Sequence, residues 1–218
     1  MSGLTRSQRK IAAELFSLPP SDGFLLAGGA ALCALAIVDR PTRDLDAFVA
    51  ARPTGEQADV RPLMDAFIER AGDLGWAVDV ARVHPTFTRL VVHAEGEVIE
   101  LDLAVDSPPM FDAMLVDGIP MLAPEDLAAR KVLAVVDRAE GRDFTDLWSL
   151  ARRFGRTECV RWATDLDAGV SVTAIAQGMT NLNRLTEDDL PCVPDETVAV
   201  REYFAAWVAE LGEEDDDG

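Results

Sequence analysis

The sequence predicts an α/β (α+β) fold followed by a helical C-terminal region. An apolar run over residues 24–27 breaks at Gly28-Gly29 and leads into an Ala- and Leu-rich segment, the pattern of a strand followed by a buried helix. Residues 86–93 and 97–105 are rich in Val and Ile and alternate around Glu95-Gly96, which is typical of a β-hairpin. Beyond residue 150 the pattern is helical and loop-rich.

The other elements follow in chain order. Residues 5–17 carry apolar side chains between charges, so we expect an amphipathic helix that ends before Pro19-Pro20. The helix over residues 30–37 begins at the glycine turn, which leaves its first amide groups available to a phosphate, and Arg40-Pro41 ends it. Further expected elements are a strand over 44–49, a helix over 61–71, a strand over 76–80, and helices from Pro124 to Arg138 and from Arg142 onward.

Length and composition bound the domain organisation. With 218 residues, 49% of them hydrophobic, the chain can bury one substantial core with a small appendage. We expect a main domain over residues 1–150 and a helical C-terminal region over 151–212. The acidic tail over 213–218 is interpreted as a disordered, solubilising end.

Composition also argues against several classes of protein. The apolar stretches are shorter than the roughly 20 residues of a membrane span, and the N-terminus lacks the apolar core of a secretory signal, so we expect a cytoplasmic protein with no membrane partner. Three scattered cysteines and two histidines make a zinc site improbable, and buried free thiols are expected. The net charge of −19 repels polyanions, so a nucleic-acid partner must meet a local basic patch.

Two aspartates form the first candidate site. Asp44 and Asp46 flank Leu45 in an expected strand, and side chains two residues apart point the same way, so both carboxylates share one face. Magnesium prefers one or two carboxylates plus phosphate oxygens from a substrate. The pair therefore indicates phosphoryl or nucleotidyl chemistry, although an isolated Asp-x-Asp is more often a surface feature of an edge strand.

The second strand of the hairpin offers a third carboxylate. Ile99, Leu101 and Leu103 face one way along it, so Glu100 and Asp102 face the other. Asp102 is the expected member of the site, and Glu100 replaces it if the register is shifted by two residues. The alternative for both is a solvent-facing stripe of a two-sided sheet.

The order of strand, glycine turn, helix and Asp-Leu-Asp strand, then the hairpin with Asp102 and a helix with Lys131, resembles the nucleotidyltransferase superfamily of polymerase-beta-like enzymes. The resemblance covers about residues 24–150 and implies a nucleotidyltransferase fold, a small mixed sheet flanked by helices, over residues 1–150. Three blocks are similar to the AbiEii/AbiGii abortive-infection toxin family, namely Gly28-Gly29-Ala30-Ala31-Leu32, Arg40-Pro41-Thr42-Arg43-Asp44-Leu45-Asp46, and Lys131 with Arg138 and Arg142-Asp143-Phe144-Thr145-Asp146-Leu147.

The resemblance implies a role for each matched residue of the first half. Gly28 and Gly29 would let the backbone approach the triphosphate of a nucleoside triphosphate (NTP), such as ATP. Asp44, Asp46 and Asp102 would bind Mg²⁺ or Mn²⁺, and Asp102 would help to deprotonate the acceptor hydroxyl.

Four further residues receive roles in the same way. Lys131 would neutralise phosphate charge, Asp143 would orient Lys131, and Thr42 and Arg89 are candidate phosphate ligands. The alternatives are ordinary structural pairs: Lys131 as a solvated base, Arg89 paired with a cross-strand acid, and Arg142 with Asp146 as a helix pair.

The resemblance also implies partners, and here alternatives stay open. In several branches of the family the acceptor is tRNA, and the enzyme is the toxin of a toxin–antitoxin pair, so an antitoxin protein is an expected partner. The acidic surface favours instead a small polycationic acceptor such as an aminoglycoside. A third reading is a non-catalytic nucleotide-binding module, because Gly29 stands where many relatives have Ser.

Overall fold

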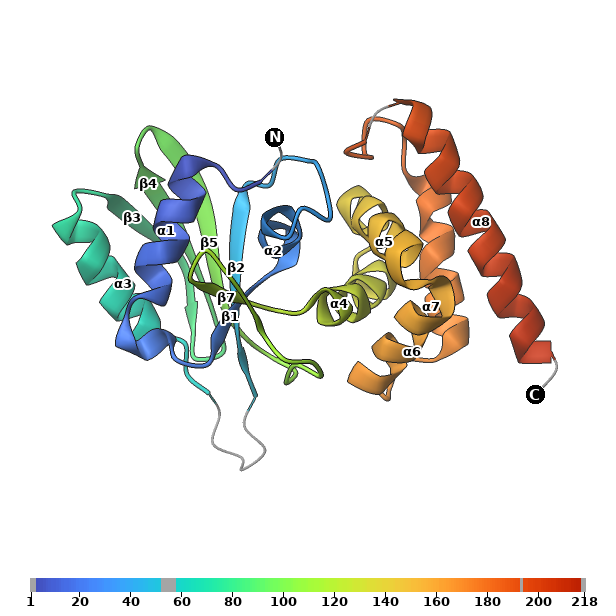
Figure 1. Ribbon diagram of the computed structural model, residues 1–218, viewed down its shortest axis with the longest axis horizontal. Coiled ribbons are helices and arrows are strands. Elements are labelled where there is room, and N and C mark those ends of the chain that lie inside the picture. Colours follow the sequence, from blue (N-terminus) through green and yellow to red (C-terminus); the bar gives the residue numbers. More distant parts are fainter. Residues whose placement is uncertain (1–2, 52–57, 193, 217–218) are drawn as a thin grey trace. The chain divides into compact units, whose positions relative to one another are not determined.

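A computed structural model of the chain describes residues 3–51, 58–192 and 194–216, and its backbone contacts divide it into two units. The first unit, Met1–Ala123, contains the sheet, and the second, Pro124–Gly218, is helical (Figure 1). The predicted α/β fold with a helical C-terminal region is therefore confirmed. The boundary between the units precedes Pro124, because the helices over 124–154 pack against later helices. The main domain expected over residues 1–150 stays a prediction.

The first unit is built on a mixed sheet of seven strands with the order β3-β4-β5-β2-β1-β7-β6. Strand β2 pairs in parallel with β5, and β1 pairs in parallel with β7, while the other neighbours are antiparallel. The small mixed sheet implied by the resemblance is thus present. The elements of this unit are α1 (Arg6–Phe16), η1 (Pro19–Ser21), β1 (Phe24–Ala27), α2 (Gly28–Ala34), β2 (Asp44–Ala50), α3 (Arg61–Asp73), β3 (Ala77–His84), β4 (Phe87–Ala94), β5 (Glu97–Asp106), β6 (Met114–Val116) and β7 (Ile119–Met121).

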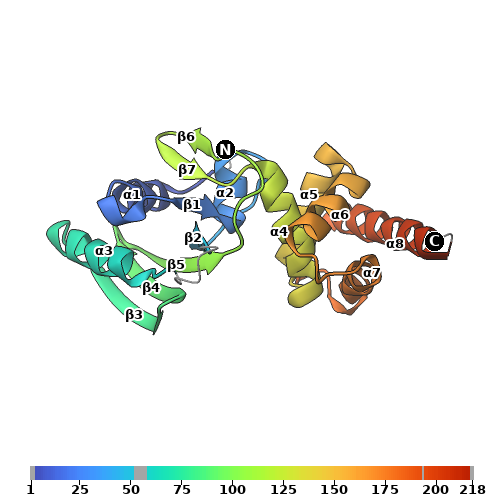
Figure 2. The same cartoon turned by 90° about the horizontal axis from the view of Figure 1, so that it is seen from below.

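The two faces of the sheet differ in chemistry. Helices α1 and α3 lie on the same side of the sheet (Figures 1 and 2). Leu45, Leu101 and Leu90 are direct partners on successive strands, so they share one face, and all three are fully buried. Because strand side chains alternate, the residues between them point to the opposite face. That face carries Asp46 and Arg89, so the apolar pattern that fixes the core also places the polar candidates together.

A short hairpin, β6–β7, is absent from the sequence-based prediction. Its turn is Asp117-Gly118, where both residues have positive φ (52° and 80°), as the tight two-residue hairpin turn requires. Each flanking strand has only three residues, and Pro120 interrupts the second one, so the usual strand pattern is weak. The Asp-Gly pair was the available signal.

The second unit is a set of packed helices. Gly178 allows close packing against the backbone of Val136, since a Cβ there would lie 2.9 Å from Val136 Cα. Trp162 and Trp207 are buried in this unit. The elements are α4 (Pro124–Asp137), α5 (Gly141–Phe154), α6 (Arg156–Leu166), α7 (Val172–Thr180), η2 (Asn181–Arg184) and α8 (Pro194–Asp216).

The end of the chain and the cysteines allow two further comparisons with the sequence. Helix α8 extends to Asp216, so the expected disordered tail is helical over residues 213–216, while 217–218 lie outside the described residues. Cys33 and Cys159 are buried free thiols as predicted, and burial raises the pKa of Cys159 to about 12, whereas Cys192 is partly exposed. None of the helices in the described ranges is long and apolar enough to span a membrane.

Candidate functional site

Strand β2 presents the two predicted aspartates on one face. Leu45 is fully buried between them, and Asp44 and Asp46 are partly exposed on the opposite side, as the alternation of the strand requires. In the parallel pairing with β5, Asp44 lies beside Glu100 and Asp46 beside Asp102. Four acids, Asp44, Asp46, Glu100 and Asp102, therefore lie on one face of two neighbouring strands.

Gly28 packs against one of these acids. It follows Ala27, which pairs directly with Asp46, and its φ of +59° lies in the left-handed region that favours glycine. A Cβ at this position would lie 1.9 Å from Asp46 Oδ2, which is a severe overlap. The first glycine of the turn is thus required for the position of the carboxylate as well as for the backbone conformation.

The second glycine, Gly29, lies against two polar side chains. A Cβ on Gly29 would lie 2.9 Å from Arg40 Nη2 and 3.1 Å from Thr42 Oγ1, so both groups stand against the start of α2. The hydroxyl of Thr42 also donates to Asp44 Oδ1 at 2.5 Å. Arg40 received only a helix-ending role from the sequence; its place just ahead of Thr42 and the two aspartates was the signal for more.

Asp102 is held by Arg89 on the adjacent strand β4. Arg89 Nε donates to Asp102 Oδ1 at 2.8 Å and Nη2 donates to Oδ2 at 2.6 Å, and Nη1 lies 3.4 Å from Glu100 Oε2. The hydrogen bonds to Asp102 raise the pKa of the Arg89 guanidinium above its ordinary value. The cross-strand alternative for Arg89 is therefore realised in the structure, and its role toward phosphate stays a prediction.

The carboxylate oxygens on β2 fit a magnesium site in which water and substrate phosphates complete the ligand shell. Over residues 3–51, 58–192 and 194–216, no group of three or more His, Cys, Asp or Glu side chains is arranged to hold a metal ion. Mg²⁺ usually takes one or two protein carboxylates and completes its shell with water and substrate phosphate. Asp44 and Asp46 have carboxylate oxygens of this type on neighbouring positions of one face, and the oxygens of Asp102 accept hydrogen bonds from Arg89.

The helical unit contains a buried ion cluster. Lys131 is only 6% exposed, and its Nζ lies 2.9 Å from Asp143 Oδ1 and 2.8 Å from Asp146 Oδ2, both of which are fully buried. Arg138 donates two hydrogen bonds to Asp143, at 2.8 and 2.9 Å. Lys131 is thus not the solvated base of the alternative reading, and the predicted pairing of Asp143 with Lys131 is present.

Asp143 is ionised because its partners outweigh its burial. Burial is the largest single influence and favours the neutral acid, but the hydrogen bonds from Arg138 and the charge and hydrogen bond of Lys131 together lower its pKa to about 2. The cluster contains two cations and two carboxylates, which limits the positive charge that Lys131 can offer to a phosphate.

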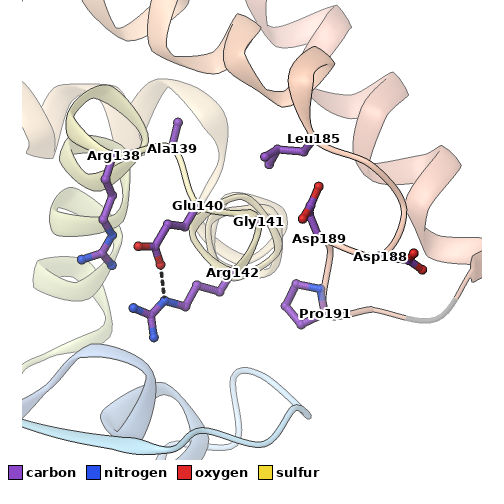
Figure 3. A pocket seen from close by; sticks show the side chains of 9 residues that line it. All are labelled: Arg138, Ala139, Glu140, Gly141, Arg142, Leu185, Asp188, Asp189 and Pro191. Atoms are coloured by element: carbon purple, nitrogen blue, oxygen red, sulfur yellow. Dashed lines mark hydrogen bonds and ion pairs between the residues drawn. The ribbon is translucent and has the colours of Figure 1, made fainter.

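A cavity of about 510 Å³ lies beside this cluster within the helical unit. Figure 3 shows Arg138 and Arg142 on one side of it and Asp188 and Asp189 on the other, with Arg142 paired to Glu140 at 2.8 Å. Its wall is tight at the start of α5, where a Cβ on Gly141 would lie 1.9 Å from the Asp189 carbonyl oxygen. The cavity is lined by both charge signs and by itself indicates no ligand class.

The fold is that of the nucleotidyltransferase superfamily. The chain is similar to a crystal structure of a putative nucleotidyltransferase from Helicobacter pylori (TM-score 0.58, 15% identity, 94% of this chain and 93% of that chain) and to that of JHP933 from Helicobacter pylori (0.56, 15%, 96% and 92%). It is also similar to the solution structure of the antibiotic-resistance factor ANT(2'')-Ia (0.52, 13%, 74% and 91%). At these identities the likeness establishes the fold alone.

The family follows from the sequence over most of its length. Residues 11–168 match the family of the nucleotidyl transferase AbiEii toxin of type IV toxin–antitoxin systems, and the chain belongs to this family. The resemblance stated from the motifs is thereby confirmed. Among curated proteins, none matches the sequence significantly.

Proposed function

We propose that this chain is a metal-dependent nucleotidyltransferase that transfers a nucleoside monophosphate from an NTP to an acceptor hydroxyl and releases pyrophosphate. Membership of a nucleotidyltransferase family supports transfer of this general kind. The observation that carries the proposal is the pairing of Asp46 with Asp102 across β2 and β5, next to a glycine turn packed against Asp46. Phosphoryl transfer depends mainly on positioning and charge neutralisation, which these groups can supply.

The triphosphate would bind at the turn between β1 and α2. Gly28 and Gly29 carry no side chain at the backbone of the turn, and the first amide groups of α2 would be available to an anion. Thr42 would donate its hydroxyl to a phosphate oxygen. Arg40 lies against the same turn, and we add it to the phosphate ligands proposed here.

Asp44 and Asp46 would hold Mg²⁺ or Mn²⁺ together with phosphate oxygens. The bound ion would neutralise charge on the phosphates as the new bond forms. Asp102, once released by Arg89, would accept the proton of the acceptor hydroxyl. The acceptor oxygen then bonds to the α-phosphorus, and the bond from that phosphorus to the β-phosphate oxygen breaks, so pyrophosphate leaves. Arg89 would turn from Asp102 toward the phosphates.

In the helical unit we propose that Lys131 acts through Asp143. Lys131 is buried against two acids, whereas Arg138 on the same carboxylate is 45% exposed. Lys131 and Asp143 would therefore fix the guanidinium of Arg138, and Arg138 would present the positive charge predicted for Lys131. Lys131 is in this view a positioning residue.

The biological setting is proposed from the family. An AbiEii toxin belongs to a type IV toxin–antitoxin system, so we propose that this chain is a toxin with an antitoxin partner, that it acts in the cytoplasm and that tRNA is its acceptor. A direct test is incubation of the purified protein with each labelled NTP, Mg²⁺ and total tRNA. We expect label in the RNA and pyrophosphate release, both lost in Asp46→Asn. No transfer with any NTP would overturn the proposal.

A second candidate acceptor is a polycationic small molecule. The net charge of −19 attracts such a molecule, and the fold is shared with an antibiotic-resistance factor. Expression in a sensitive bacterium separates the two: protection from an aminoglycoside supports the small-molecule acceptor, and growth arrest abolished by Asp46→Asn supports the toxin. Metal-dependent nucleotide binding without any product would indicate the non-catalytic module.

A further inference from the structure

A row of four charged residues crosses the sheet on the face of the candidate site. The residues are directly opposite partners on successive strands: Asp46 on β2 pairs with Asp102 on β5, Asp102 with Arg89 on β4, and Arg89 with Arg82 on β3. Directly opposite residues project to the same face. The row therefore changes from two acids at the centre of the sheet to two arginines at its outer edge.

Arg82 belongs to this row because of a β-bulge. Val80 pairs with Leu90 and Arg82 pairs with Arg89, so Ala81 is an extra residue in β3. Without the extra residue, Ala81 would lie opposite Arg89 and the side chain of Arg82 would point to the other face. A bulge that redirects a side chain next to a site is a recurrent feature of sheets. Here it adds a positive charge to the face that holds the acids.

The two arginines share one aromatic ring. The guanidinium carbon of Arg82 lies 5.4 Å from the centroid of the Phe87 ring, and that of Arg89 lies 5.9 Å from it. Phe87 is partly exposed at the start of β4, and its partner on β5 is the small residue Ala104. Arg82 is exposed and forms no ion pair with any residue that the structure describes. The outer end of the row is thus an uncompensated cation beside a partly open ring.

Spacing relates this cluster to the reacting hydroxyl. Strands lie about 4.8 Å apart, so Arg82 is roughly 10 Å from Asp102 along the row. If Asp102 accepts the proton of the acceptor hydroxyl, Arg82 lies where the phosphates next to the reacting end of a nucleic-acid chain would lie. A polycationic acceptor would meet like charge there, whereas a nucleic acid would find a phosphate ligand and a surface on which a base can stack.

We propose that Arg82 and Phe87, with the outer edge of Arg89, form the acceptor subsite, and that the acceptor is a single-stranded end of a nucleic acid. The phosphates of the acceptor would contact the guanidinium groups of Arg82 and Arg89, and one of its bases would stack on Phe87. This inference rests on the proposed nucleotidyl transfer for the identity of the reacting hydroxyl. It also supplies the local basic patch that a chain with a net charge of −19 needs to approach a polyanion.

The test measures binding of a fluorescent single-stranded RNA oligonucleotide to the full chain without nucleotide, by anisotropy. Arg82→Ala is compared with Arg152→Ala, a matched control because Arg152 is also exposed and lies over a ring, 4.6 Å from the centroid of Trp148. We expect Arg82→Ala to weaken binding about three- to tenfold and to reduce the slope of log affinity against log salt by about 0.7, as for one lost phosphate contact. Arg82→Lys should keep most of the slope, and Arg152→Ala should match the wild type.

The inference is overturned if Arg82→Ala binds RNA as the wild type does, if the control loses as much, or if only an aminoglycoside binds. Its failure can be separated from failure of the proposed function. If the chain transfers nucleotides to RNA and Arg82→Ala leaves the KM for RNA unchanged, the proposed subsite is wrong and the proposed activity stands. If no nucleotidyl transfer is found but RNA binding still depends on Arg82, the proposed activity is wrong and the proposed binding surface stands.

Discussion

Arg89 and Asp102 are joined by two parallel hydrogen bonds across β4 and β5, at 2.8 and 2.6 Å. Such a fork-to-carboxylate pair is geometrically specific and stronger than a single contact. It occupies the carboxylate that lies opposite Asp46, so a metal ion that used Asp102 as a ligand would compete with Arg89 for the same oxygens.

This competition gives a prediction for metal binding. Removal of the guanidinium in Arg89→Ala should tighten Mn²⁺ binding to the nucleotide-free protein by up to about fivefold, which corresponds to the ~1 kcal/mol upper value for an exposed ion pair. The same change should weaken NTP binding. Titration followed by Mn²⁺ electron paramagnetic resonance measures the first effect, and Arg61→Ala, which removes an exposed arginine paired with Asp59, is the control. Unchanged or weaker Mn²⁺ binding in Arg89→Ala would contradict competition.

Gly28 should tolerate no side chain. Gly28→Ala introduces a Cβ that overlaps Asp46 and places alanine at φ +59°, a conformation that costs roughly 1–2 kcal/mol for an L-residue. We expect a loss of stability larger than that range and loss of transfer, because Asp46 must move. Gly75→Ala is the matched control, since Gly75 has φ +73° and nothing within 4 Å of its Cβ position. Chemical denaturation measures the stability and NTP assays measure the activity of both variants. Equal losses in the two variants would show that the contact between Gly28 and Asp46 has no role.

Lys131 should contribute strongly to folding. Lys131→Met leaves Asp143 and Asp146 buried without their shared cation, and breaking a buried pair in this way costs about 3–5 kcal/mol. The free energy of unfolding in urea measures the effect. Lys10→Met removes a more exposed lysine paired with Glu95, for which a loss below about 1 kcal/mol is expected. A Lys131→Met protein as stable as the Lys10→Met control would show that the buried pairs of Lys131 contribute little to folding.

Ionised Asp143 should contribute to the free energy of unfolding, and this contribution should be lost at acid pH. Its pKa in the folded chain is about 2, below the ordinary value of 3.8, so its stabilisation is present above about pH 4 and is lost as the pH falls from 4 toward 2. Asp143→Asn should therefore be less stable than the wild type by about 2 kcal/mol at neutral pH, and the difference should shrink below pH 4. Unfolding followed from pH 7 to pH 2 tests this, with the exposed Asp112→Asn as control. A difference that stays constant with pH would disprove the linkage.

Features with a local cause were predictable from the sequence. The alternation of Asp44, Leu45 and Asp46 has the period of a strand, and burial of Leu45 puts both acids on the other face whatever the strand pairs with. The same rule placed Asp102 correctly within its strand. The Glu95-Gly96 turn has the positive φ values, 53° and 85°, that its composition indicates. The order of these local signals was enough to recognise the family.

Relations between distant segments had to come from the folded chain. Pairing of β2 with β5 brings Asp46 beside Asp102, and pairing of β4 with both neighbours gives Arg89 to Asp102 and adds Arg82 through the extra residue Ala81. Burial of Lys131 between two acids likewise depends on the packing of α4 and α5. Periodicity states which way a side chain points, but strand register and helix packing select its neighbours, and an ionic group acquires its role from those neighbours.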